Sequence, residues 1–311
     1  MNKLLVLSVD APKYAKLLQA ADLPFLEVTA RQNPHNVPDF SDYNIILGDP
    51  GLVSPALGSV TDLEWVQSTW AGVDDLCGKG LRRDYLLTGV KDVFGPAISE
   101  YVLAYIFANE RQIFTQRDNQ LKHQWSPLPY RRCSDILVGI AGLGSIGRHL
   151  ANSLRQLGFQ LSGLNRSGTS CDAMQKVYSG TNVRGFLEQP DYVVLTLPDT
   201  QETDGFINAE TLGMMKNTSV LINVGRGNAI DEMALVSAIN NGIIAGAVLD
   251  VFASEPLAQE SPLWDLPNVL ITPHTAATSF PEDIFNIFVE NYRRYLDRAP
   301  MLNVVDFELG Y

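Results

Sequence analysis

The stretch Asp135-Ile-Leu-Val-Gly-Ile-Ala-Gly-Leu-Gly-Ser-Ile-Gly147 decides the fold of this chain. Its first part, residues 136–141, is a short apolar run of the kind that forms a buried strand. Glycines then follow in the pattern Gly-x-Gly-x-x-Gly, at Gly142, Gly144 and Gly147. Leucines at helical spacing continue as far as Gly158, where we expect a helix to end. A glycine pattern between a strand and a helix is a far more specific signal than the pattern alone.

Each glycine has its own reason to be there. Gly142 permits the tight turn out of the strand, Gly144 has no side chain to hold a pyrophosphate away from the backbone, and Gly147 lets the helix pack closely on the strand. The start of the helix adds unpaired N–H groups and the positive end of its dipole. The stretch therefore predicts a dinucleotide site formed by Gly142, Leu143, Gly144, Ser145, Ile146 and Gly147.

Length and composition narrow the class of protein. The chain has 311 residues, enough for two domains, and its 46% hydrophobic and 19% charged residues are typical of a globular protein. The formal net charge of −12 argues against nucleic acid or an anionic membrane as a partner, because either requires a basic face. No apolar run approaches the roughly 18 residues that cross a bilayer.

The three cysteines, Cys77, Cys133 and Cys171, are widely spaced and odd in number. They form neither a disulfide framework nor a metal-ligand cluster, so we expect no metal and a reducing, cytoplasmic environment.

Apolar runs and helical patterns alternate along the whole chain. In the first part we expect a helix over residues 14–20 and strands over 3–9, 25–29, 44–47, 63–68 and 85–89. A long helix then begins at Pro96 and bridges to the unit with the glycine stretch, where we expect a helix over 231–240 and strands over 136–141, 160–164, 191–197, 218–224, 243–251 and 268–272. A last helix begins at Pro281. This order predicts an α/β protein with a doubly wound parallel sheet.

The segment Leu121–Cys133, with two prolines, is expected to be a surface connection after the bridging helix. Its His123 and Trp125 could reach the site of a partner subunit, but a solvated helix end is the favoured interpretation.

The end of the second strand in a dinucleotide domain indicates which nicotinamide cofactor binds. An acidic residue is expected there, about 20 residues beyond the glycines, to hold the ribose 2′-hydroxyl. Here Asn165 stands in that place, followed by Arg166 and Ser167, which can hold a 2′-phosphate by charge-assisted hydrogen bonds. The sequence therefore favours NADP(H), with NAD(H) possible.

Three polar residues follow the ends of three successive predicted strands: Arg226, Glu255 and His274. Each has a plain interpretation, as a surface arginine, an exposed loop acid and a helix cap. Their equivalent positions favour a shared site, because ligands of open α/β sheets bind beyond the carboxyl ends of the strands. Histidine suits proton transfer near neutral pH, a carboxylate partner orients its ring, and a planar guanidinium can hold two substrate oxygens. These are the groups that reduction of a 2-keto acid requires.

At these residues the chain resembles the D-isomer-specific 2-hydroxyacid dehydrogenases. The motifs that carry the resemblance are Gly142–Gly147, Asn223-Val-Gly-Arg-Gly227, Leu249-Asp-Val-Phe252, Glu255-Pro-Leu257 and Pro267-Asn-Val-Leu-Ile-Thr-Pro-His274. Within the family, Ser261-Pro-Leu-Trp264 and the ending Gly310-Tyr311 are most similar to the glyoxylate/hydroxypyruvate reductase A branch.

The resemblance implies roles and an architecture. It implies that Arg226 binds substrate, His274 is the acid/base, Glu255 is its partner, and the backbone of Trp70, Ala71, Gly72 and Val73 receives the substrate carboxylate. Further expected cofactor contacts are Leu197, Pro198, Val224, Gly225, Arg226, Asp250 and His274. A Rossmann dinucleotide domain, residues 97–281, would be inserted in a smaller flavodoxin-like substrate domain, residues 1–96 and 282–311, and the protein would be a homodimer.

The predicted activity is NADPH-dependent reduction of glyoxylate or hydroxypyruvate to the D-2-hydroxy acid. One alternative keeps the enzyme but changes the substrate, to 3-phosphoglycerate with NAD or to a bulkier 2-keto acid. Near Trp70 and Gly48 there is no adjacent lysine or arginine for a substrate phosphate, which disfavours the first of these. The other alternative is a nucleotide-sensing scaffold without turnover, but the chain has almost nothing beyond the two domains to serve as an interaction tail.

Overall fold

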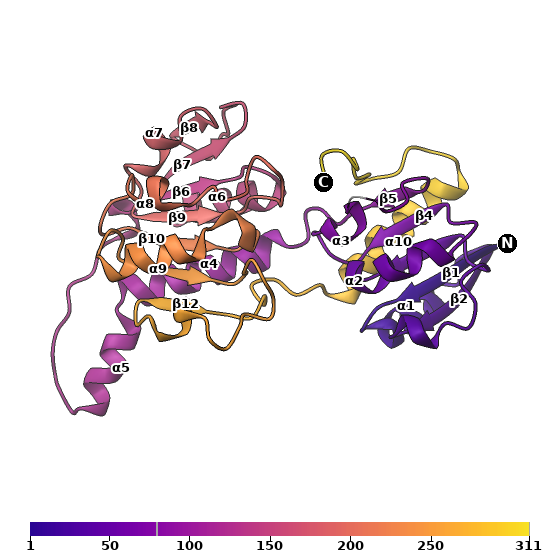
Figure 1. The fold of residues 1–311 in the computed structure, drawn as a ribbon, viewed down its shortest axis with the longest axis horizontal. Coiled ribbons are helices and arrows are strands. Elements are labelled where there is room, and N and C mark those ends of the chain that lie inside the picture. The colour runs from indigo at the N-terminus through magenta and orange to yellow at the C-terminus, as the bar shows by residue number, and fades with distance from the viewer. Residues whose placement is uncertain (79, 311) are drawn as a thin grey trace. The chain divides into compact units, whose positions relative to one another are not determined.

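The computed structural model describes residues 1–78 and 80–310, so that Tyr311, part of the ending quoted above, lies outside the described residues. The chain forms two compact units (Figure 1). The first comprises Met1–Val93 and Ser279–Tyr311, and the second comprises Phe94–Thr278. The last helix of the chain thus returns to the unit formed by its beginning.

The first unit has a five-stranded parallel sheet in the order β2-β1-β3-β4-β5. Its strands are β1 (Asn2–Leu7), β2 (Leu26–Arg31), β3 (Ile45–Gly48), β4 (Trp65–Ser68) and β5 (Leu86–Thr88). Its helices are α1 (Ala11–Ala21), α2 (Pro50–Val53), α3 (Asp74–Cys77) and α10 (Pro281–Leu296). This strand order is that of the flavodoxin-like doubly wound sheets.

Helix α10 is fixed to the first unit by aromatic stacking and by a buried amide. The ring of Phe288 stacks on Trp65 of β4 at a centroid distance of 5.1 Å. Nearby, the buried Asn291 donates a hydrogen bond to the side-chain oxygen of Gln67, at 3.2 Å. Because these contacts join residues more than two hundred positions apart in sequence, they make the N-terminal and C-terminal segments one structural unit.

The second unit has a seven-stranded parallel sheet in the order β12-β11-β10-β9-β6-β7-β8. Its strands are β6 (Leu137–Ala141), β7 (Gln160–Asn165), β8 (Lys176–Ser179), β9 (Tyr192–Leu195), β10 (Val220–Asn223), β11 (Gly246–Leu249) and β12 (Val269–Ile271). Its helices are α4 (Gly95–Glu110), α5 (Ile113–Leu121), α6 (Ser145–Gln156), α7 (Val183–Leu187), α8 (Ala209–Leu212) and α9 (Glu232–Asn240). The predicted α/β class and doubly wound Rossmann sheet are confirmed.

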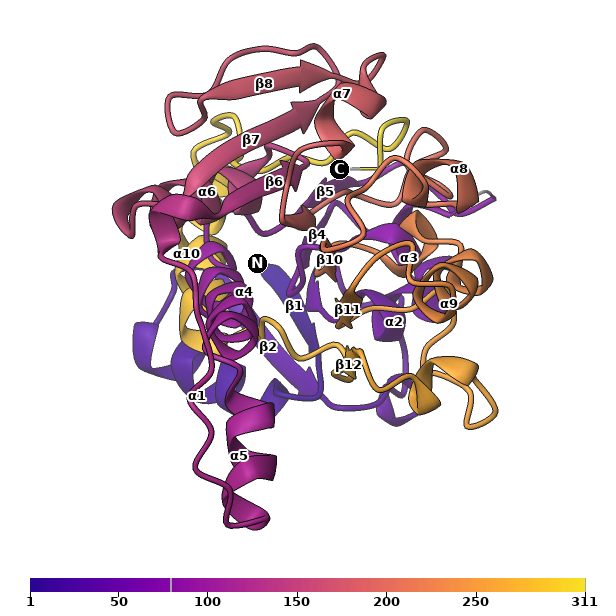
Figure 2. The same ribbon diagram turned by 90° about the vertical axis from the view of Figure 1, so that its left-hand side faces the viewer.

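The segment after α4 differs from the expected continuous helix. The backbone φ of Gln112 is 51°, so α4 ends and α5 starts in a new direction. In both views of the ribbon α5 projects away from the sheet of its own unit (Figures 1 and 2). The returning chain is tied to the last residue of α4, where Arg131 binds the buried Glu110 at 2.6 Å, and to the turn between the helices, where Gln112 donates to the carbonyl of Pro129 at 2.6 Å. In the part of the chain that the structure describes, no helix is long and apolar enough to span a membrane.

Candidate active site

The glycine loop joins β6 to α6, and two of its glycines are sterically required. Gly142 has a φ of 97°, and a Cβ atom there would lie 2.7 Å from the carbonyl oxygen of Thr196. A Cβ atom at Gly147 would lie 2.0 Å from the carbonyl oxygen of Gly142. A side chain at Gly142 would push the loop away from Thr196, which follows β9, and a side chain at Gly147 would force α6 away from the end of β6.

Gly144 is different, because a Cβ atom there would meet nothing within 4 Å. The packing of the protein therefore does not explain this glycine, whereas the close approach of a bound pyrophosphate does. The loop is also held in place, since the Arg148 side chain donates to the carbonyl of Leu143 at 2.7 Å. Together with the start of α6, this arrangement fits a dinucleotide phosphate group.

The residues expected to select the cofactor lie at the end of β7. The side chain of Asn165 closes a local turn: it accepts a hydrogen bond from the N–H of Gly168 at 2.6 Å and donates to the carbonyl of Thr169 at 2.9 Å. Ser167 and Thr169 share a hydrogen bond of 2.5 Å between their hydroxyl groups. Arg166 extends from this turn toward solvent and forms an ion pair with Glu202, at 3.1 Å.

Other expected cofactor contacts lie at the ends of β9 and β10, two neighbouring strands. A Cβ atom at Gly225 would lie 2.7 Å from the carbonyl oxygen of Leu197, so the two backbones touch. Pro198 follows, and its carbonyl accepts a hydrogen bond from the Thr203 hydroxyl at 2.6 Å. Val224 is buried beside this contact.

Arg226 is positioned by a buried asparagine at the end of β10. The Asn223 side chain accepts a hydrogen bond from the N–H of Gly225 at 3.1 Å and donates to the carbonyl of Arg226 at 2.9 Å. The Arg226 guanidinium, which is partly buried, donates to the carbonyl of Gly225 at 2.8 Å. The sequence placed Asn223 in a motif but assigned it no role. Its side chain is buried at the end of β10, where it positions the backbone of Arg226.

The loops after β10 and β11 are in backbone contact. A Cβ atom at Gly227 would lie 1.8 Å from the carbonyl carbon of Phe252, so the position accepts only glycine. The N–H of Phe252 donates to Glu255 Oε1 at 3.0 Å, and the peptide bond between Glu255 and Pro256 is cis. The loop that carries Arg226 therefore packs directly on the loop that orients Glu255.

His274 and Glu255 are hydrogen-bonded to each other. The Nδ1 atom of His274 lies 2.8 Å from Glu255 Oε2. Because an ionised carboxylate can only accept a hydrogen bond, the proton of this bond lies on Nδ1. The backbone of His274 has a φ of 53°, which is rare for a residue other than glycine, and its N–H donates to the carbonyl of Asp250 at 2.8 Å.

The buried carboxylate of Asp250 organises the loop that carries His274. It accepts hydrogen bonds from the Thr272 hydroxyl at 2.6 Å and from the N–H groups of Thr275 at 2.8 Å and Ala276 at 2.9 Å. The Thr272 hydroxyl is in turn 2.6 Å from that of Tyr101, whose pKa is raised by burial. The sequence placed Thr272 in a motif without a role and gave Tyr101 no role at the site. Whether Asp250 also contacts the cofactor stays a prediction.

The segment Trp70–Val73 follows β4 in the first unit. The Ser68 hydroxyl accepts from the N–H of Trp70 at 3.0 Å and donates to its carbonyl at 2.8 Å, which fixes the start of the loop. The Trp70 side chain is exposed, and Val73 is buried in the core of the unit. The expected contact of this segment with substrate stays a prediction.

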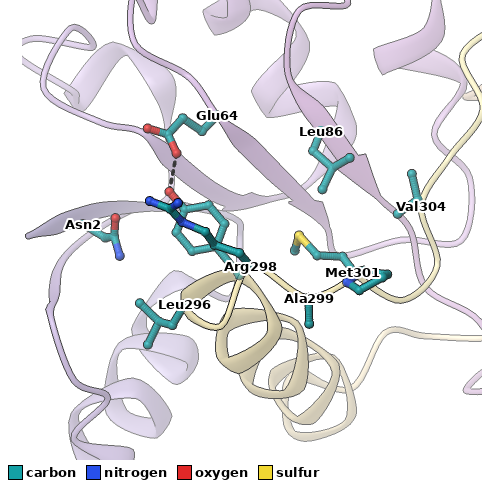
Figure 3. Close-up of a pocket in the computed structure, with 10 residues that line it drawn as sticks. Asn2, Glu64, Leu86, Leu296, Arg298, Ala299, Met301 and Val304 are labelled. Carbon is teal, nitrogen blue, oxygen red and sulfur yellow. Dashed lines mark hydrogen bonds between the residues drawn. The ribbon is translucent and has the colours of Figure 1, made fainter.

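A pocket of about 700 Å³ lies elsewhere in the first unit (Figure 3). It is lined by residues at the amino ends of three strands, Asn2, Glu64 and Leu86, and by the end of α10 with the segment that follows. The Tyr295 hydroxyl donates to Glu64 at its rim. Because Trp70–Val73 lies at the carboxyl end of β4, the pocket is at the opposite edge of the same sheet and does not belong to the predicted site.

Among residues 1–78 and 80–310, no group of three or more histidine, cysteine or acidic side chains is arranged to hold a metal ion. The three cysteines are free. The groups that the structure places at the carboxyl edge of the second unit's sheet are Arg226, the His274–Glu255 pair and the glycine loop.

Comparisons with known proteins show which family the chain is similar to. Residues 103–276 match the family model described as "D-isomer specific 2-hydroxyacid dehydrogenase, NAD binding domain". A glyoxylate/hydroxypyruvate reductase A of Klebsiella pneumoniae is 35% identical over 217 residues, which are 70% of this chain and 70% of that protein.

Two solved structures have the same fold over nearly the whole chain. A D-isomer specific 2-hydroxyacid dehydrogenase family protein of Aeromonas salmonicida superposes with a TM-score of 0.94 at 40% identity, covering 98% of this chain and 99% of that one. An NADPH-dependent glyoxylate/hydroxypyruvate reductase of Sinorhizobium meliloti was solved in complex with NADP and sulfate. It superposes with a TM-score of 0.90 at 30% identity, covering 100% of this chain and 100% of that one.

Proposed function

Because the chain belongs to the D-isomer specific 2-hydroxyacid dehydrogenase family of NAD(P)-dependent enzymes, we propose that it reduces a small 2-keto acid, glyoxylate or hydroxypyruvate, with NADPH. The product is the D-2-hydroxy acid. The observation that carries the proposal is the 2.8 Å pairing of His274 with Glu255, whose loop packs against the loop of Arg226 at the carboxyl edge of one sheet.

His274 is the proton donor in this proposal. Glu255 holds the ring through Nδ1, so Nε2 is the nitrogen that gives its proton to the oxygen of the reduced carbonyl. The negative carboxylate stabilises the charged imidazolium before transfer and holds one ring orientation. Glu255 is itself held through its second oxygen by the N–H of Phe252, so the pair is fixed on the backbone.

Arg226 binds the substrate. Its guanidinium can hold the carboxylate and the keto oxygen of a 2-keto acid together, and its positive charge stabilises the negative charge that develops on that oxygen. A nicotinamide cofactor, when bound, supplies the hydride. Trp70–Val73 is proposed to receive the substrate carboxylate, as a role of a substrate-binding domain formed by residues 1–96 and 282–311.

The cofactor assignment rests on the end of β7. An asparagine occupies the place of the usual acid, and its side chain is engaged in closing the turn. Arg166 and Ser167 then offer a cation and a hydroxyl to a 2′-phosphate. The similarity to a reductase solved in complex with NADP supports the same choice.

The test is a panel of 2-keto acids, namely glyoxylate, hydroxypyruvate, pyruvate and phenylpyruvate, each assayed with NADPH and with NADH. We expect the highest kcat/KM for glyoxylate or hydroxypyruvate with NADPH. His274→Ala should lower kcat by at least about 100-fold, the usual contribution of a positioned general acid, while NADPH binding is retained. Full activity of that variant would overturn the assignment, and a strong preference for NADH would overturn the cofactor.

A homodimer is also proposed. The projecting helix α5 and the segment after it expose apolar side chains, Ile113, Phe114, Leu121 and Trp125, and Trp125 is 98% exposed. Several exposed apolar side chains on one projecting segment are typical of a surface that is covered in an assembly.

A further inference from the structure

We propose that Glu202 is a specificity-determining residue for the cofactor, because its carboxylate competes with the 2′-phosphate of NADPH for Arg166. The inference rests on the proposed function in one respect, that Arg166 binds this phosphate. It adds Glu202, a residue of another loop. The preference for NADPH then depends on how the Glu202 carboxylate and the 2′-phosphate compete for Arg166.

The ion pair lies where the nucleotide is expected. Arg166 follows β7, and Glu202 is in the loop after β9. Strands β7 and β9 are the two neighbours of β6, and Ala141 at the end of β6 is in register with Leu164 on one side and Leu195 on the other. The pair therefore joins the loops on either side of the strand that leads into the glycine loop.

Both partners extend from ordered turns. Arg166 follows Asn165, whose side chain closes the turn to Thr169. On the other side, the Thr203 hydroxyl donates to the carbonyl of Pro198 at 2.6 Å and accepts from the N–H of Thr200 at 3.0 Å. Glu202 immediately precedes this anchored threonine, so its backbone is held where its side chain reaches Arg166.

The ion pair is weak enough to be displaced. The side chains are 62% and 69% exposed, and ion pairs this exposed contribute little because water screens them. A phosphate carries nearly two negative charges and can accept two parallel hydrogen bonds from a guanidinium, so it is the stronger ligand for Arg166. When the 2′-phosphate binds, however, it must displace the Glu202 carboxylate from Arg166, and the two anions then remain close and repel each other. Both effects weaken NADPH binding. NADH has only a hydroxyl at this position and encounters neither effect.

The experiment compares Glu202→Gln with the unchanged protein by titrating NADPH, NADH, 2′,5′-ADP and 5′-AMP. We expect the Kd of NADPH and of 2′,5′-ADP to fall about three- to fivefold, the size of a surface charge effect, and to fall less at high salt. The Kd of NADH and of 5′-AMP should stay within about twofold, which also shows that the variant is folded. The matched control is Glu188→Gln, which removes the carboxylate of another exposed ion pair, with Arg184, and should change none of the four.

Arg166→Gln separates this inference from the proposed function. If this variant binds NADPH as tightly as the unchanged protein, the cofactor assignment fails, and the inference fails with it. If Arg166→Gln weakens NADPH binding but Glu202→Gln leaves it unchanged or weakens it, the cofactor assignment stands and competition by Glu202 is overturned. A gain for NADH equal to that for NADPH would also overturn it, since the carboxylate would then act on the whole nucleotide.

Discussion

At the scale of single residues, the loop of His274 shows how an unfavourable backbone conformation is maintained. A φ of 53° is costly for a histidine, and it persists where the surroundings determine it. Here Asp250 accepts three hydrogen bonds from residues on both sides of His274. The Thr272 hydroxyl has a single proton, which it donates to Asp250, so the Tyr101 hydroxyl must donate to Thr272. A chain of hydrogen bonds thus runs from α4 to the backbone of the proposed acid.

Thr272→Val tests this chain, because valine has nearly the same shape but no hydroxyl. We expect the free energy of unfolding to fall by about 1–3 kcal/mol, since one bond of a buried carboxylate is lost. The kcat should also fall, because the loop that holds His274 loses a support, while the Kd for NADPH should change little. Chemical denaturation and steady-state kinetics measure the two effects. Thr61→Val is the control, since it makes the same change at an exposed position; an equal loss in both variants would contradict the argument.

The sequence could predict the members of the site that depend on local pattern. Arg226, Glu255 and His274 each follow an apolar run, and strand ends in a parallel sheet lie at one edge. It could not predict Tyr101, which is 171 positions from Thr272, or Glu202, whose loop has no pattern of its own. Such contacts depend on how helices and loops pack over the sheet, and no local spacing encodes that packing.

At the scale of elements, too, the sequence predicted the features that a local pattern shows and missed those that depend on packing. Strongly apolar strands such as β9 and β10 were predicted because every side chain is buried. Strand β8 was missed, since it is a short edge strand whose residues are only partly buried. Helix α5 was missed as a separate helix because one residue, Gln112 in the left-handed region, turns the chain within an uninterrupted helical pattern. A sequence pattern records burial, which is only partial in β8, and no residue of α5 is buried.

Helix α5 tests the proposed homodimer. Phe114 and Leu121 are seven positions apart and so lie on one face of the helix, and both are exposed. Phe114→Asp would place a charge on this face, so we expect the dimer to dissociate and the mass measured by light scattering to halve. Gln116→Asp places the same charge about 200° around the helix and should leave the dimer intact. A monomeric unchanged protein at micromolar concentration would contradict the proposal directly.

At the scale of the whole molecule, stability against acid depends on a carboxylate network at the amino edge of the second unit's sheet. Asp191 precedes β9, and its Oδ2 atom accepts from the N–H of Leu137 at 2.9 Å. Its other oxygen lies 3.2 Å from both the Arg131 guanidinium and the Lys216 ammonium. Arg131 also binds the buried Glu110, and that hydrogen bond raises the pKa of Arg131. One network thus joins the base of the projecting segment to the central strands.

The pKa of Asp191 gives the sign of its contribution. Burial alone would raise it, but the Leu137 N–H, Arg131 and Lys216 together hold it below the ordinary value of 3.8. A carboxyl group whose pKa is lower in the folded state stabilises the protein above the unfolded-state pKa. That contribution is lost as the pH falls through 3.8 and then through the lower pKa of the folded state. The network therefore stabilises the molecule at neutral pH and fails in acid.

Asp191→Asn should lower the free energy of unfolding at pH 7 by about 1–3 kcal/mol, because an amide cannot form the charged bonds. The difference from the unchanged protein should be constant between pH 7 and 5 and should shrink below pH 3.8, where the unchanged protein loses its own carboxylate. Urea denaturation at a series of pH values measures both quantities. Asp62→Asn, at an exposed position, is the control and should not reproduce the full effect. A difference that stays constant through pH 3 would show that shape and not charge makes Asp191 necessary, because only an ionised group can lose its contribution by binding a proton.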